Sequence, residues 1–216
     1  MKQKICRRKF LRIAGITVGG LVVSCSGLTA LAVHSPRLSY PVVSYEGEKS
    51  MKILIAYSSK TGSTAEIAQA IGEVISQKGA DVDVMPVKAV SNLAGYQAVI
   101  AGSAIRMGKW TGEAVNFVQK NQSQLSQMPV VYFTVHMLNL GDDPESVQMR
   151  QAYTAPVRQI LSPKSEVFFA GRMDLSKLSF LEKLIAKAVK AVDQDLRDWK
   201  LIRGWAEEIA PALGIG

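Results

Sequence analysis

The sequence is poor in the residues that metal and thiol chemistry require. It contains two cysteines and two histidines among 216 residues. Cys6 and Cys25 both lie within residues 1–33, so the remaining chain has no disulfide, no thiol nucleophile and no cysteine-based metal site. The histidines, His34 and His136, are too few for a histidine cluster. We therefore expect no metal centre.

Acidic residues are absent from residues 1–33, and this absence explains most of the net charge. That segment carries six lysines and arginines, and the whole chain has a net charge of +8. Only +2 is then left for residues 34–216, so the high isoelectric point belongs mainly to the N-terminal segment. A basic patch spread over the folded part is the usual mark of nucleic-acid binding. We therefore expect no nucleic-acid partner.

Residues 1–33 have the three-part form of an export signal. The run Arg7-Arg8-Lys9-Phe10-Leu11-Arg12 precedes an uncharged stretch at 13–33, and it resembles the twin-arginine signal of bacteria and archaea. The resemblance implies export of a folded protein to the periplasm or the outer face of the cytoplasmic membrane. Three fates stay open: cleavage after Ala30-Leu31-Ala32, lipidation of Cys25, and retention as a membrane anchor. Cys6 departs from the signal, which usually has Ser or Thr at that position.

A linker is expected at 34–50, which holds prolines, Gly47 and scattered charge. The segment 51–212 then alternates short apolar runs with amphipathic helix patterns, as parallel α/β sheets do. A helix is expected to begin at Asp143-Pro144, and Pro156 should break or kink it. The expected strands cover 53–56, 81–85, 97–101, 129–136 and 167–170, and the closing helix covers 198–210.

The turn after the first expected strand is rich in hydroxyl groups. Ser or Thr occupies positions 58, 59, 61, 63 and 64, directly before a helix pattern. Hydroxyls, backbone N–H groups and the positive end of a helix dipole together favour a phosphate. Neither G-x-x-x-x-G-K-[ST] nor G-x-G-x-x-G follows this strand, which excludes two common nucleotide loops. The alternative is an ordinary turn in which one Ser or Thr caps the helix.

The hexapeptide Ser59-Lys60-Thr61-Gly62-Ser63-Thr64 resembles the flavodoxin fingerprint T-x-T-G-x-T, with Ser in the first position. The resemblance implies that Ser58 to Thr64 hold the phosphate of FMN. It also implies a flavodoxin-like three-layer sandwich with a five-stranded parallel sheet in the order 2-1-3-4-5. Ligands of such sheets bind beyond the carboxyl ends of the strands, where two further loops are expected.

The second loop follows the third strand, and its small residues would let the backbone approach a flavin ring. Trp110 is expected either to cover a ring face or to pack half-buried on its own domain. For Arg106 we favour a substrate or the cofactor over a surface acid. The loop residues expected to frame the ring are Ser103, Ala104, Ile105, Arg106, Met107, Gly108 and Trp110.

The third loop starts at the end of the fourth strand, where flavodoxins often stack a tyrosine that this chain lacks. Thr134, Val135, His136 and Asn139 are expected to frame the ring. His136 is either a proton carrier or a hydrogen-bonded residue at the strand end. His136 and Arg106 are the only candidates for catalytic side chains, and both are weak.

Several further stretches resemble the menaquinone-dependent protoporphyrinogen dehydrogenases, a flavodoxin-like family. The resemblance implies an FMN-dependent oxidoreductase with a porphyrinogen donor and a quinone acceptor. An exported electron-transfer protein without its own small substrate is the alternative, and a flavodoxin-like protein without flavin is a third. The stretches are Ser103 to Gly108, Phe117 to Lys120, Met128-Pro129, Phe169 to Arg172 and Asp198 to Ala206.

An inserted helix is expected within Leu175 to Asp195, before the closing helix. Its apolar positions share one face, and Lys183, Lys187 and Lys190 populate the rest. Two interpretations stay open: the helix packs on its own domain, or it lies on an anionic membrane surface close to lipid quinone.

Overall fold

A computed structural model describes residues 40, 42–48, 51–188 and 191–215. The predicted export signal at 1–33 and most of the predicted linker lie outside these residues. In the part of the chain that is described, no helix is both long and apolar enough to cross a membrane.

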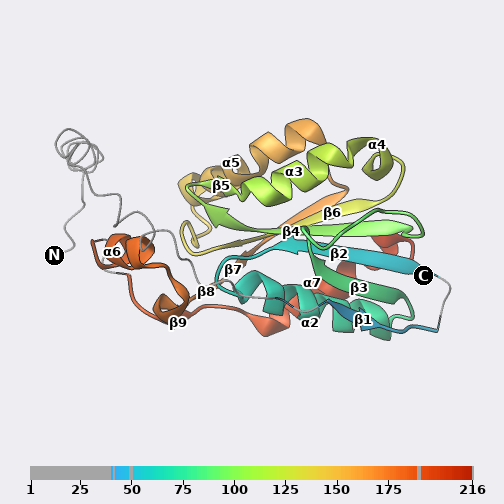
Figure 1. Ribbon diagram of the computed structural model, residues 1–216, viewed down its shortest axis with the longest axis horizontal. Coiled ribbons are helices and arrows are strands. Elements are labelled where there is room, and N and C mark those ends of the chain that lie inside the picture. The colour runs from blue at the N-terminus through green and yellow to red at the C-terminus, as the bar shows by residue number, and fades with distance from the viewer. Residues whose placement is uncertain (1–39, 41, 49–50, 189–190, 216) are drawn as a thin grey trace, which may run out of the picture.

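The core of the fold is a parallel sheet of five strands in the predicted order. Neighbouring strands pair in the order β3-β2-β4-β6-β7, which is 2-1-3-4-5 when only these five are counted. Helices cover both faces, as Figure 1 shows, and the predicted three-layer sandwich is confirmed. The strands are β2 (Lys52–Ser58), β3 (Asp81–Pro86), β4 (Ala98–Arg106), β6 (Val130–His136) and β7 (Ser165–Ala170).

Each face of the sheet has its own hydrophobic core, because side chains alternate along a strand. Ile53, Ile55 and Tyr57 of β2 face α2 (Ser63–Gln77) and α7 (Trp199–Ile209). Leu54 and Ala56 face the opposite core, which α3 (Gly112–Lys120) and α5 (Pro144–Ile160) cover together with the short α4 (Gln122–Leu125). Burial on both faces explains why the strands have continuous apolar sequences.

Three local predictions were wrong. Part of the predicted linker is strand β1 (Val43–Tyr45), which pairs antiparallel with β3. The predicted loop 102–110 is largely a hairpin of β4 with β5 (Lys109–Trp110). Helix α5 continues through Pro156 to Ile160, so Pro156 does not break the helix as one of the two predicted outcomes required, and the buried side chain of Val157 packs this last turn against the core.

The predicted inserted helix is confirmed as α6 (Phe180–Ala188), and it lies within a longer excursion at the carboxyl end of the sheet. The excursion begins with β8 (Arg172–Met173) and the 3-10 helix η1 (Leu175–Lys177). It returns through β9 (Gln194–Asp195), which pairs antiparallel with β8. A final 3-10 helix, η2 (Pro211–Leu213), follows α7.

A buried carboxylate fastens β1 to the sheet. Asp83 of β3 accepts hydrogen bonds from Ser44 Oγ at 2.5 Å and Tyr96 Oη at 2.7 Å, and Lys52 Nζ lies 2.8 Å away. Burial alone would raise the pKa of Asp83, but the three donors outweigh it and lower the pKa. The ionised carboxylate therefore stabilises the fold.

Replacing this carboxylate should produce a pH-dependent loss of stability. Because the folded pKa lies below the ordinary value of 3.8, the stabilisation is present above that pH and disappears as the pH falls through the folded pKa. Asp83→Asn should lower the free energy of unfolding by about 1–3 kcal/mol at pH 7 and by much less at about pH 3. Denaturant titrations at both pH values measure this, with the exposed Asp142→Asn as control. An equal loss at both pH values would contradict it.

Candidate functional site

The predicted phosphate turn lies between β2 and α2, at the carboxyl end of the sheet. Helix α2 begins after Gly62, whose φ of 99° is a left-handed conformation that favours glycine. Gly62 provides no side-chain cap, and its N–H donates to Ser59 Oγ at 3.1 Å. By contrast α3, α5 and α7 are capped by Thr111, Asp143 and Asp198. The ordinary capped turn is therefore not what this sequence forms.

The first turn of α2 leaves donors for an anion. Among the described residues, no hydrogen bond engages the backbone N–H groups of Ser63, Thr64 and Ala65. The positive end of the helix dipole lies at the same point. Ser63 Oγ accepts the N–H of Arg172 at 3.0 Å and keeps its own hydrogen for a further partner. Phosphate is the ligand that such a terminus suits.

Ser58 has a different surrounding from the other predicted phosphate residues. It stands in register with Ser103 of β4, which stands in register with Thr134 of β6. The three hydroxyls form a buried row on the face that α3 and α5 cover. Thr111 Oγ1 donates to Ser58 Oγ at 2.7 Å and lies 3.2 Å from Ser103 Oγ. The row therefore fastens the start of α3 to the sheet. Because the hydroxyls of Ser58 and Ser103 are engaged within the protein, the row argues against the predicted phosphate role of Ser58 and the predicted ring-framing role of Ser103.

Trp110 lies in the core, and the expectation that it covers a ring face was wrong. Only 2% of the residue is exposed. Its Nε1 donates to Thr134 Oγ1 at 2.8 Å, and its ring centroid lies 4.8 Å from that of Tyr132. The hairpin turns the side chain inward because Trp110 pairs with Ile105. Trp110 and Thr134 thus hold the hairpin and present nothing to a ligand.

A carboxylate that the sequence analysis missed lies beside the phosphate turn. Glu113, in the first turn of α3, accepts Ser58 Oγ at 3.4 Å and pairs with Lys88 Nζ at 2.8 Å. Burial would raise the pKa of Glu113, but Lys88 and then Lys60 outweigh it and lower the pKa. Glu113 is therefore ionised at neutral pH and steers Lys60, which is exposed in the turn. Acids are common in the first turn of helices, so the position of Glu113 in the sequence did not indicate a role in the site.

His136 ends β6 in a buried position. Its Nδ1 lies 2.7 Å from the carbonyl of Leu138, so this nitrogen carries the hydrogen and donates it. Burial, with a contribution from Arg150, lowers the pKa of His136. The imidazole is neutral at pH 7 and packs beside Tyr153, which fits the hydrogen-bonded strand-end residue and argues against the proton carrier.

Arg106 forms an ion pair with Glu182 of α6. Its partner in this structure is therefore an acid of its own chain, whereas the sequence favoured a cofactor or a substrate. Met107, at the hairpin tip with φ 51°, is 98% exposed, and Gly108 follows with φ 76°. Ala104 and Ile105 are strand residues of β4. The second loop therefore presents its Met107 tip at the surface, while Trp110 lies in the core.

Hydrogen bonds with helix α5 hold the third loop at Asn139. Asn139 has φ 59°, its Nδ2 donates to Tyr153 Oη at 2.5 Å, and its carbonyl accepts Arg150 at 2.6 Å. Val135 is buried in the core below it. The exposed apolar side chains of this loop are Leu138 and Leu140, which are 72% and 44% exposed, and the acids Asp142 and Asp143 that follow are exposed as well. The loop thus offers an apolar rim at the carboxyl end of the sheet.

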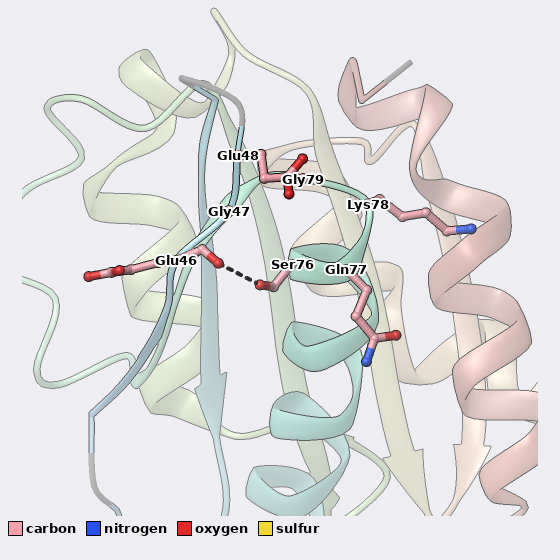
Figure 2. Close-up of a pocket in the computed structure, with 7 residues that line it drawn as sticks. All are labelled: Glu46, Gly47, Glu48, Ser76, Gln77, Lys78 and Gly79. Atoms are coloured by element: carbon pink, nitrogen blue, oxygen red, sulfur yellow. Dashed lines mark hydrogen bonds between the residues drawn. The ribbon is translucent and has the colours of Figure 1, made fainter.

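A surface pocket lies at the far end of α2, away from the phosphate turn. Its lining includes Glu46, Glu48 and Lys78, and Ser76 Oγ donates to the carbonyl of Glu46 at 3.3 Å. Figure 2 shows the two carboxylates pointing away from each other. The pocket is the junction between the β1 segment and α2, and its polar groups do not converge. Within the residues that the structure describes, no cluster of acids, histidines and cysteines suits a metal ion.

Comparison with known proteins agrees with this geometry. Residues 54–199 match the flavodoxin domain family. The chain is 26% identical over 176 residues to protoporphyrinogen IX dehydrogenase [quinone] of Leishmania major, which covers 75% of this chain and 76% of that protein. The protein of the same name from Escherichia coli strain K12 is 24% identical over 172 residues, which cover 74% of this chain and 95% of that protein.

A solved flavodiiron core from Synechocystis superposes with a TM-score of 0.50 at 14% identity over 76% of this chain. Our chain spans only 36% of that protein, and the likeness is one of fold alone. The family match extends from β2 to the start of α7 and so includes all three loops. The chain therefore belongs to the flavodoxin-domain family, and its membership implies a flavin cofactor.

Proposed function

We propose that this protein is an FMN-dependent oxidoreductase that passes electrons from a porphyrinogen-type donor to a quinone. The observation that carries the proposal is the uncapped N-terminus of α2, where Gly62 replaces a capping side chain. The substrate class rests on the two relatives named as quinone-dependent protoporphyrinogen IX dehydrogenases, one of which is matched over 95% of its length.

The residues of the turn fit a flavin that carries one phosphate. The free N–H groups of the first turn of α2 and the hydroxyls of Thr61, Ser63 and Thr64 would hold the phosphate, and Lys60 adds a positive charge. Ser59 Oγ, like Ser63 Oγ, accepts one backbone N–H and keeps its own hydrogen for the phosphate. FMN, when bound, supplies one- and two-electron transfer.

The chain's own residues position the site and shape its entrance. The contacts of Trp110 and Thr111 with the hydroxyl row fix the hairpin that ends in Met107. Met107, Leu138 and Leu140 give the carboxyl end of the sheet an exposed apolar rim. Such a rim suits large molecules with extensive apolar surface, such as the macrocycle of a porphyrinogen and the ring and side chain of a lipid quinone. His136 stays neutral and buried, so protons would be exchanged with solvent.

Turnover tests this function directly. Full-length protein in mild detergent, loaded with FMN, is mixed without oxygen with protoporphyrinogen IX and menaquinone. Oxidation of the porphyrinogen to the porphyrin releases six electrons and six protons, which reduce three quinones to three quinols. Porphyrin fluorescence should therefore rise only when protein, FMN and quinone are all present. A flavin-loaded protein that gives no turnover with any quinone, yet exchanges electrons rapidly with a protein partner, would contradict the proposal and favour a carrier without its own substrate.

Removing two turn hydroxyls should weaken FMN selectively. Thr61→Ala with Thr64→Ala removes two donors to a charged phosphate, so the Kd of FMN should rise about 100-fold. Riboflavin lacks the phosphate, and its Kd should change less than about twofold. Titration calorimetry with both flavins measures this. Unchanged FMN affinity in the double variant would place the phosphate elsewhere.

Trp110→Phe is the matched control for that experiment. It leaves Thr134 Oγ1 buried without its donor, so the free energy of unfolding should fall by about 1–3 kcal/mol. The Kd of FMN should stay within about threefold of the original value, because Trp110 lies in the core. A large loss of FMN affinity in a variant that folds normally would restore Trp110 as a ring-facing residue.

A further inference from the structure

A segment outside the flavodoxin match runs along the whole length of α2. We call Tyr40 and residues 42–48 the N-terminal strap; the family match begins only at residue 54. A Cβ built on Gly72 in mid-helix would lie 3.0 Å from the ring of Tyr45. At the far end of the helix, Ser76 Oγ donates to the carbonyl of Glu46. At its beginning, a Cβ on Gly62 would lie 3.8 Å from Tyr40 Cε1.

The strap brings two tyrosine hydroxyls together beside the phosphate turn, and both lack a partner. Tyr40 Oη and Tyr57 Oη are buried without a hydrogen bond among the described residues. Their ring centroids lie 6.1 Å apart, and Tyr57 is fully buried at the end of β2. Leaving a hydroxyl buried and unpaired costs about 1–3 kcal/mol. Two such donors next to an uncapped helix point to an acceptor that binds there.

Both phenols are donors at physiological pH. Burial, with a contribution from Tyr40, raises the pKa of Tyr57 to about 12. Burial likewise raises the pKa of Tyr40, although the nearby hydroxyl of Ser59, which makes no hydrogen bond of normal geometry with Tyr40 Oη, acts in the opposite direction. A protonated phenol can donate to an anion but adds no charge of its own, so the arrangement favours a ligand rich in acceptor oxygens.

A lysine from the excursion after β7 reaches the same point. Lys177 Nζ lies 3.4 Å from the position that a Cβ on Gly62 would take. Its ion-pair partner is Asp174 at 3.8 Å, and that carboxylate is already bound by Arg172 at 3.0 Å. Lys177 is therefore weakly paired where it faces the turn.

The acid nearest the turn is neutralised. Glu66, in the first turn of α2, pairs with Arg197, which also binds Asp195 at 2.6 Å. The side chain of Arg197 is only 5% exposed, so this pairing is well shielded from solvent. Each acid in this cluster is paired with a cation: Glu66 and Asp195 with Arg197, and Asp174 with Arg172 and Lys177. Lys60 adds a further positive charge at the turn.

We propose that Tyr40 and Lys177 complete the phosphate site, closing it from the N-terminal strap and from the excursion after β7. The inference rests on the proposed function and deepens it: the fingerprint turn supplies one wall and these two side chains supply the cover. A phosphate held there satisfies the two phenols and pairs with Lys177. The strap therefore belongs to the cofactor site, although it precedes the flavodoxin match.

Flavin titrations of the full-length protein in mild detergent test this. Tyr40→Phe and Lys177→Gln should each raise the Kd of FMN about tenfold, because each removes one hydrogen bond or ion pair to a charged group. The effect of Lys177→Gln should shrink at 1 M salt, since salt screens a partly exposed charge. The Kd of riboflavin should change less than about twofold in both variants.

The controls use side chains of the same kind that do not meet the turn. Tyr45→Phe keeps the strap but lies at mid-helix, and Lys187→Gln lies on the exposed side of α6; neither should change FMN binding. Denaturant titration checks that every variant unfolds at the original midpoint. If Tyr40→Phe folds less stably, Lys177→Gln alone decides the matter, because its side chain is partly exposed.

Each outcome separates this inference from the proposed function. Original protein that fails to bind FMN would end the proposed function itself. FMN binding that is intact in both variants, or equal losses of FMN and riboflavin, would overturn the cover and leave the function standing. A tighter Kd in Tyr40→Phe would also overturn it, because Tyr40 would then compete with the phosphate.

Discussion

The start of helix α2 is the constraint around which this molecule is arranged. A helix must satisfy the N–H groups of its first turn, and the other long helices for which a cap is described do so with Thr or Asp side chains. At α2 a glycine in a left-handed conformation takes that place and leaves the donors free. The strap, the β7–β8 connection and η1 all approach this one point. Their convergence is most simply explained by an anion that they share.

At the carboxyl end of the sheet, the polar groups on one face are paired within the protein, whereas those on the other face are largely unpaired. On the face that α3 and α5 cover, Thr111 and Trp110 form hydrogen bonds with the hydroxyls at the end of the sheet, which are those of Ser58, Ser103 and Thr134. These hydroxyls are buried and engaged within the protein. On the α2 face, the donors remain free and the covering side chains are weakly paired. We therefore expect the phosphate of the ligand on the α2 side, while the contacts on the opposite side hold the hairpin.

The strand order could be predicted from the resemblance to flavodoxins, and the positions of the helices and of the hydroxyl-rich turn could be predicted from local sequence patterns. The uses of single polar side chains could not. The local sequence around Trp110 does not reveal whether the hairpin turns its side chain toward the core or toward solvent. The acid that pairs with Arg106 lies 76 residues later in the chain, on α6. Strand β1 was not predicted because the contacts that hold it involve residues elsewhere in the chain. Ser44 of β1 donates to Asp83, which also binds Lys52 and Tyr96. Glu113 was missed because its role depends on Lys88 and Ser58.

The central claim is that the free N–H groups of α2 hold the phosphate of the flavin. Amide nuclear magnetic resonance of the ¹⁵N-labelled full-length protein in detergent micelles tests it most directly. The resonances of Ser63, Thr64 and Ala65 should shift strongly when FMN is added and should stay nearly unmoved with riboflavin. If saturating FMN shifts other amides and leaves these three unchanged, the phosphate binds elsewhere and the account is wrong.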